Sequence, residues 1–115
     1  VCSSDLILSY AASVAPNAPG TPTLTYYPAN TTTLDWGYYA TWADSTSGTT
    51  PISYYLRGYG SNDGYVSQLA IRGPFTTGSS AQYFTLPRSN TTWKVVAYAS
   101  NSAGNSPDSG KSNSA

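Results

Sequence analysis

The stretch Thr91–Ser106, TTWKVVAYASNSAGNS, decides the fold. Apolar residues occupy every second position of its first half: Trp93, Val95, Ala97 and Ala99. Alternation with a period of two predicts a β-strand with one buried face, which we place at Thr91–Ser100. The Asn101–Asn105 segment contains Gly104 and predicts a loop after that strand.

Short segments of the same alternating kind recur along the rest of the chain, and helical periodicity is absent. They predict strands at Thr21–Tyr27, Thr31–Trp36, Ile52–Tyr59, Tyr65–Ile71, Ala81–Leu86 and Ser106 to about Asn113. A Ser61–Gly64 turn joins two of them, and Gly37–Thr50 and Arg72–Ser80 are expected to be loops. Short alternating strands with frequent turns predict an all-β, seven-stranded antiparallel sandwich of two sheets.

The inward-facing side chains follow from the alternation within each strand. In the Ile52–Tyr59 strand the even positions are expected to face inward, because the other register would bury Arg57. The predicted structural core consists of Leu24, Leu34, Trp36, Ile52, Leu56, Leu86, Trp93 and Val95. Trp36 is expected to be essential to this core, because truncation of a buried Trp costs about 3–5 kcal/mol.

The residues at these positions resemble those of a fibronectin type III domain. The resemblance rests on Leu24, Leu34-x-Trp36, Pro51-Ile52, Leu86 and the alternating run from Thr91 to Ser106, and it covers roughly residues 18–113. It implies a repeat-type extracellular module used as a spacer, a display scaffold or a binding surface. The family usually has Tyr where this chain has Trp93, and an indole N–H can donate a hydrogen bond but not accept one. The chain contains no Arg-Gly-Asp triplet, so integrin binding through that motif is not supported.

The first six residues, Val1-Cys2-Ser3-Ser4-Asp5-Leu6, resemble one translated reading frame of a short sequencing adaptor. We interpret residues 1–6 as an artefact of a metagenomic fragment and exclude them from the fold. The alternative is a genuine N-terminus in which Cys2, the single cysteine, is a free thiol.

Residues 7–17 are predicted to be a linker or the end of a preceding domain, and residues 18–115 the fibronectin type III-like domain. The apolar patch Ile7–Ala15 has a second interpretation as the tail of a signal peptide cleaved after Ser13-Val14-Ala15. Pro16 directly after that position argues against cleavage there, so we favour the end of a preceding domain for this patch, followed by a stiff interdomain linker at residues 16–20.

The composition argues against several classes of function. The five Lys and Arg residues are scattered and the formal net charge is zero, so no basic surface is expected that would bind nucleic acid. No apolar run approaches the roughly 20 residues of a membrane span. The chain has no His, and its acids are five scattered Asp residues, so we expect no catalytic residue, no metal site and no cofactor. We therefore predict that the chain is not an enzyme, and its hydroxyl- and amide-rich composition favours an extracellular location.

The aromatic residues outside the predicted strands suggest a binding surface. The strand order brings three predicted loops to one pole of the sandwich, and with them a possible binding patch of Tyr38, Tyr39, Trp42, Phe75 and Asn101. The N-terminal linker is expected to enter at the same pole, so we favour packing against it or a neighbouring domain over a free ligand site. The two functional hypotheses are a structural spacer and a module that binds a glycan or a protein. Asn30 and Asn90 begin Asn-x-Thr sequons, which are weak evidence of glycosylation in a Thr-rich chain.

Overall fold

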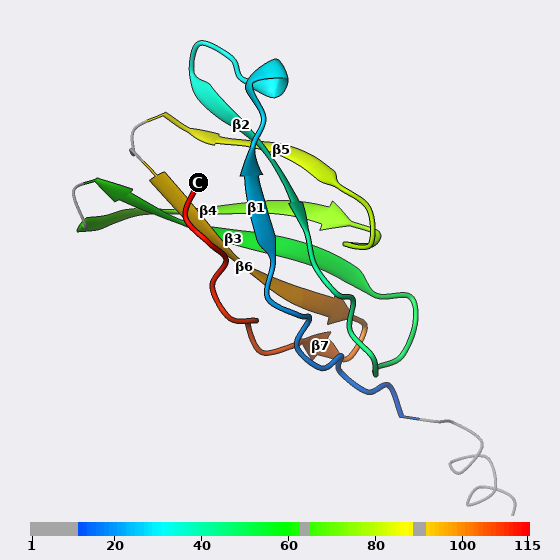
Figure 1. Cartoon of the computed structure of the whole chain (residues 1–115). Helices are drawn as coiled ribbons and strands as arrows, with labels where there is room; N and C mark the ends of the chain where they lie inside the picture. The colour runs from blue at the N-terminus through cyan, green and yellow to red at the C-terminus, as the bar shows by residue number, and fades with distance from the viewer. Residues whose placement is uncertain (1–11, 63–64, 89–91) are drawn as a thin grey trace, which may run out of the picture.

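The computed structural model of the chain describes residues 12–62, 65–88 and 92–115 (Figure 1). The predicted artefact at residues 1–6 with Cys2, residues 7–11 of the apolar patch and the sequon residue Asn90 lie outside them. The described strands are β1 (Thr23–Tyr26), β2 (Asp35–Thr41), β3 (Ser53–Asn62), β4 (Tyr65–Phe75), β5 (Gln82–Pro87), β6 (Thr92–Asn101) and β7 (Gly104–Asn105). A short 3-10 turn, Pro28–Asn30, separates β1 from β2.

The strands form two antiparallel sheets. The small sheet has the order β1-β2-β5, and the large sheet has the order β4-β3-β6-β7. Figure 1 shows the two sheets stacked face to face, with the C-terminal segment running beside β1 and β6. The predicted all-β sandwich of two antiparallel sheets is confirmed. The β3–β4 hairpin is also confirmed by the Asn62–Tyr65 pairing, although residues 63 and 64 of its turn lie outside the described residues.

The core lies between the sheets. The most completely buried large side chains are Leu56 from β3, Leu86 from β5, and Trp93 and Val95 from β6. Leu24 from β1 is also buried, while Trp36 and Ile52 are half-buried and pack against the edge of the core. The Trp93 indole donates a hydrogen bond to the Pro87 carbonyl oxygen (3.1 Å), so this side chain also ties the start of β6 to the end of β5.

The prediction for the second strand was wrong in position. β2 begins at Asp35, and Leu34 is 80% exposed instead of buried. The Thr32 hydroxyl accepts hydrogen bonds from the amides of Leu34 and Asp35, which holds this part of the chain in a turn. Thr and Leu alternate in that turn as they would in a strand, so periodicity alone does not distinguish the two.

The boundary predicted at Gly37 was also wrong, because β2 continues through it. A Cβ atom at Gly37 would lie 2.5 Å from the Tyr27 carbonyl oxygen and from the Asn30 carbonyl carbon. The 3-10 turn therefore packs directly onto β2, and glycine is present because of close contact and not because of a loop. β4 likewise extends four residues beyond the predicted Ile71, and it contains Pro74, which an edge strand can accommodate.

The C-terminal segment is not the strand predicted at Ser106 to about Asn113. The amides of Ser106, Ser109 and Ser112 donate to the carbonyl oxygens of Ala99, Ala97 and Val95 on β6, at 2.7–2.8 Å. Each of these serines also accepts a hydrogen bond on Oγ from the amide of the same β6 residue, at 2.8–2.9 Å. The hydrogen-bonded positions are therefore three residues apart in this segment and two residues apart in β6. We call residues 106–115 the serine ladder.

The serine ladder also joins the two sheets. The Asn113 side chain accepts a hydrogen bond from the Leu24 amide (2.9 Å) and donates one to the Leu24 carbonyl oxygen (2.8 Å). The ladder thus satisfies the edge of β6 with serines and the edge of β1 with an asparagine. An otherwise open side of the sandwich is covered by a segment that is not itself a regular strand.

Candidate functional site

The predicted binding patch is largely part of the core. Tyr38 lies in β2 and Trp42 directly follows it, and both side chains are buried. The rings of Trp42 and Phe75 contact each other at 5.8 Å between centroids, so the expectation that these two lie close together is correct. The expectation that they form an accessible loop surface is wrong. β2 extends five residues beyond the predicted strand, and its alternation turns the Tyr38 and Trp42 rings inward. Phe75, the last residue of β4, is partly buried against the core.

The loop after β4 closes over Trp42. A Cβ atom at Gly78 would lie 2.2 Å from the Trp42 ring, so only glycine allows this approach. The Asp44 carboxylate holds the loop in place by accepting hydrogen bonds from the Gly78 amide (2.7 Å) and the Thr77 hydroxyl. Asp44 therefore has a structural partner, and its position gives no support for a catalytic carboxylate.

The Asn101 side chain binds the N-terminal segment. Its side-chain amide donates hydrogen bonds to the carbonyl oxygens of Val14 (2.6 Å) and Thr49 (2.9 Å). Val14 and Thr49 also pair through their own backbone, from the Thr49 amide to the Val14 carbonyl oxygen at 3.0 Å. The N-terminal segment therefore lies at the pole that the sequence predicted, and the Asn101 side chain holds it there.

Asn17 makes the most extensive contacts of that segment. Its Oδ1 accepts hydrogen bonds from the amides of Thr46 (2.8 Å) and Ser47 (3.0 Å), and its Nδ2 donates to the Thr46 hydroxyl (2.9 Å). Its carbonyl oxygen accepts from the Ser45 hydroxyl at 2.7 Å. Pro16 is buried against Gly48, whose positive φ of 122° favours glycine. We call residues 13–20 with the loop 44–50 the entrance clamp.

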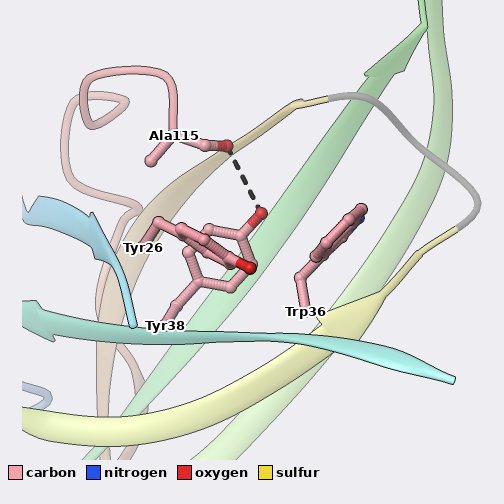
Figure 2. A pocket seen from close by; sticks show the side chains of 4 residues that line it. All are labelled: Tyr26, Trp36, Tyr38 and Ala115. Carbon is pink, nitrogen blue, oxygen red and sulfur yellow. Dashed lines mark hydrogen bonds between the residues drawn. The ribbon is translucent and has the colours of Figure 1, made fainter. Parts of the chain in front are cut away.

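A shallow pocket lies at the opposite end of β2. Its lining residues are Tyr26, Trp36, Tyr38 and Ala115, and its volume is about 260 Å³ (Figure 2). The Tyr26 ring meets the Trp36 and Tyr38 rings edge-on, at 5.8 and 5.9 Å between centroids. Figure 2 shows the Tyr38 hydroxyl pointing to the Ala115 carbonyl oxygen, to which it donates a hydrogen bond of 3.4 Å.

The pocket has little chemistry beyond its aromatic walls. Burial, with a smaller contribution from Tyr26, raises the pKa of Tyr38 from 10.0 to about 12, so this hydroxyl remains protonated near neutral pH. The Arg88 guanidinium lies over the Trp36 ring at 4.1 Å from its centroid. The pocket therefore offers rings and a neutral hydroxyl, and no acid–base pair.

A second aromatic cluster lies on the outer face of the small sheet. Tyr27, Tyr39 and Tyr83 have ring centroids 5.1–5.8 Å apart. Of this tyrosine triad, only Tyr39 belongs to the predicted patch, and it faces away from Tyr38 and Trp42. Tyr83 could have been identified from the sequence, because it alternates with the inward-facing Phe84 in the predicted Ala81–Leu86 strand.

Within the described residues, no cluster of three or more His, Cys, Asp or Glu side chains is placed to hold a metal ion. Those residues also contain no helix long and apolar enough to cross a membrane.

Comparison with known proteins identifies a structural relative but no sequence family. No protein-family description matches the chain, and no curated protein matches it either. A solved structure described as titin kinase and its flanking domains superimposes with a TM-score of 0.59. The match covers 88% of this chain at 17% sequence identity, which supports a common fold alone. The chain has an immunoglobulin-like β-sandwich fold. It spans 17% of the length of that structure, so the comparison concerns one domain of a longer protein.

Proposed function

We propose that the chain is a non-catalytic module of the fibronectin type III kind, and that it serves as a rigid spacer in a longer extracellular polypeptide. The sheet topology supports the type of module. In immunoglobulin constant domains the fourth strand joins the sheet of the first, second and fifth strands. Here β4 pairs with β3, and the division of strands is β1-β2-β5 against β4-β3-β6-β7.

The contact between Trp93 and Pro87 also supports this assignment. In immunoglobulin-like domains a tyrosine near the start of the sixth strand donates a hydrogen bond to the backbone a few residues upstream. The Trp93 indole makes such a bond to the carbonyl oxygen of Pro87, six residues earlier. Because this contact needs only a donor, the replacement of Tyr by Trp preserves it.

The entrance clamp is the observation that carries the spacer proposal. A flexible linker would leave the module free to rotate relative to the polypeptide before it. Here Val14 and Asn17 are instead hydrogen-bonded to the 44–50 loop, and Pro16 and Pro19 are buried. A segment held in this way would keep a preceding module in a fixed orientation relative to this one. A neutral surface rich in hydroxyl and amide groups supports the proposed extracellular location, and the absence of His favours a non-catalytic role.

The rigidity of the entrance can be measured by ¹⁵N relaxation on the whole chain. We expect order parameters for residues 13–20 of about 0.85, the value of a rigid backbone. The Asn17→Ala variant should lower them, whereas Asn105→Ala, which changes an exposed asparagine on β7, should not. Order parameters below about 0.6 in the unmodified chain would contradict the rigid-spacer proposal. Recovery of the longer coding sequence with no neighbouring module would contradict it independently.

A further inference from the structure

The tyrosine triad occupies the middle of an exposed sheet face. Core residues such as Tyr38 and Phe84 alternate with Tyr39 and Tyr83, so the latter two point away from the large sheet. Tyr39 pairs directly with Tyr83, and Tyr27 lies beyond the end of β1 with its ring 5.1 Å from that of Tyr83. Tyr83 is 56% exposed, and the other two are half-buried. Two of the three tyrosines, Tyr39 and Tyr83, thus stand on paired strands, which hold their rings in place.

The surroundings of the triad are rich in hydroxyl groups. By alternation, Thr23 and Thr25 of β1 and Thr41 of β2 share its face of the sheet. Charged groups of both signs bond to Thr85 of β5: the Asp35 carboxylate accepts a hydrogen bond from its hydroxyl (3.2 Å), and Arg72 Nε donates to its carbonyl oxygen (2.7 Å). Because these two groups have opposite signs, they give the face no excess of either charge.

We propose that the tyrosine triad binds a neutral, soluble glycan chain. The C–H faces of sugar rings stack on aromatic side chains, and their hydroxyl groups exchange hydrogen bonds with tyrosine and threonine hydroxyls. Because Asp35 and Arg72 have opposite charges, the face matches a neutral glycan better than a partner with a strong charge of one sign. This proposal goes beyond the spacer function, since it assigns a ligand to a face that the entrance clamp does not use.

The orientation of the rings specifies the form of the glycan. Their planes are inclined to one another by 79° for Tyr27 and Tyr39, 46° for Tyr27 and Tyr83, and 59° for Tyr39 and Tyr83. Three rings so inclined cannot all stack on one flat surface. They can contact successive sugars of a twisted chain in solution, so the flat face of a crystalline polysaccharide is not the expected ligand.

The test is an NMR titration of the whole ¹⁵N-labelled chain with cellohexaose, xylohexaose, mannohexaose, chitohexaose and maltoheptaose. At least one sugar should shift the amides of Tyr39 and Tyr83 saturably, with a Kd on the order of 1 mM or tighter. Tyr83→Ala should weaken that binding about tenfold, because a stacking ring is lost. Tyr83→Phe keeps the ring and should retain the affinity to within about threefold. Retention on microcrystalline cellulose is not expected.

Tyr55→Ala provides the matched control, since it removes a half-buried tyrosine from the outer face of the large sheet and should leave the affinity unchanged. A dispersed spectrum for each variant confirms that it is folded. The proposal is overturned if none of the five sugars shifts the triad amides at about 10 mM, or if Tyr83→Ala binds as tightly as the unmodified chain. Equal weakening by Tyr55→Ala would also overturn it. None of these outcomes affects the spacer proposal, which depends on Asn17 and the order parameters of residues 13–20.

Discussion

The outer faces of the two sheets both carry tyrosines, but only those of the large sheet are covered. Tyr55 stacks on Tyr98 with ring centroids 5.3 Å apart, and the Arg57 guanidinium lies over Tyr98 at 4.9 Å. Arg57 is held by an ion pair of 2.8 Å with Asp108. Lys111 likewise lies over Tyr59 at 4.9 Å. Both Asp108 and Lys111 belong to the serine ladder.

On the small sheet, the rings of Tyr27, Tyr39 and Tyr83 contact one another. The difference follows from the path of the C-terminal segment, which runs along β6 and brings its charged side chains to the large sheet. The tyrosines of this domain therefore have two roles. Those on the face that the serine ladder covers are structural, and those on the other face are available for contact.

The largest expected effect separates the core tryptophans of the two sheets. Trp93 on β6 is fully buried and bonded to Pro87, so Trp93→Ala should cost about 3–5 kcal/mol in the free energy of unfolding. Trp36 on β2 is half-buried at the pocket, and Trp36→Ala should cost less, about 1–2 kcal/mol. Urea denaturation of both variants gives the comparison. An equal or greater loss for Trp36→Ala would show that the small sheet carries as much of the core as the large one.

This ranking replaces the expectation drawn from the sequence, in which Trp36 was essential to the core. The sequence predicted β6 and its inward residues well, because Trp93, Val95, Ala97 and Ala99 repeat with a period of two over seven residues, which a helix does not match. It misplaced β2, because the Thr-rich turn before Asp35 alternates like a strand and Gly37 resembles the start of a loop. The contact that requires Gly37 comes from the Tyr27–Asn30 segment and is visible only once the chain is folded.

The candidate site was predicted less well than the fold, for a related reason. With β2 placed too early, Tyr38 and Trp42 were assigned to a loop and predicted to be accessible. The pole at which the N-terminal segment packs was predicted correctly, since that prediction depends on strand order and not on exact strand boundaries. The serine ladder was missed as a structure. Its signal, Ser at 106, 109 and 112, is visible in the sequence but has neither the period of a strand nor that of a helix.

The second prediction tests the cover of the large sheet directly. Ser112 is buried, and its hydroxyl accepts the hydrogen bond of the Val95 amide at 2.9 Å. Ser112→Ala leaves that amide without its side-chain partner, and we expect a loss of about 1–3 kcal/mol in urea denaturation. Ser114→Ala, at an exposed position of the same segment, should change the stability by less than about 0.5 kcal/mol. If the two variants are equally stable, the ladder does not close the edge of β6.

The third prediction concerns alkaline pH and the small sheet. The pKa of Tyr38 is raised to about 12 in the folded chain, against about 10 when unfolded, because burial disfavours the phenolate. The stability that this shift provides is complete below pH 10 and is lost as the pH rises from 10 to 12. At pH 11 the loss should be about 1 kcal/mol relative to pH 8. Tyr38→Phe removes the titrating group, so its stability should fall less over the same interval. A fall of the same size in Tyr38→Phe would assign the pH dependence to other tyrosines.

The smallest expected effect is the one that bears most directly on the two outer faces. Tyr83→Thr places another residue of high β-propensity on an exposed position, so we expect a change in unfolding free energy of less than about 0.5 kcal/mol. Tyr98→Thr makes the same replacement on the covered face, where the residue is 8% exposed and its ring contacts Tyr55 and Arg57. That variant should lose about 1–3 kcal/mol in the free energy of unfolding, because buried area and aromatic contacts are removed. Urea denaturation at one pH measures both. A cost above about 1 kcal/mol for Tyr83→Thr would mean that the triad stabilises the small sheet as Tyr98 stabilises the large one. The two faces would then differ only in the exposure of their tyrosines, because tyrosines on both faces would stabilise the fold.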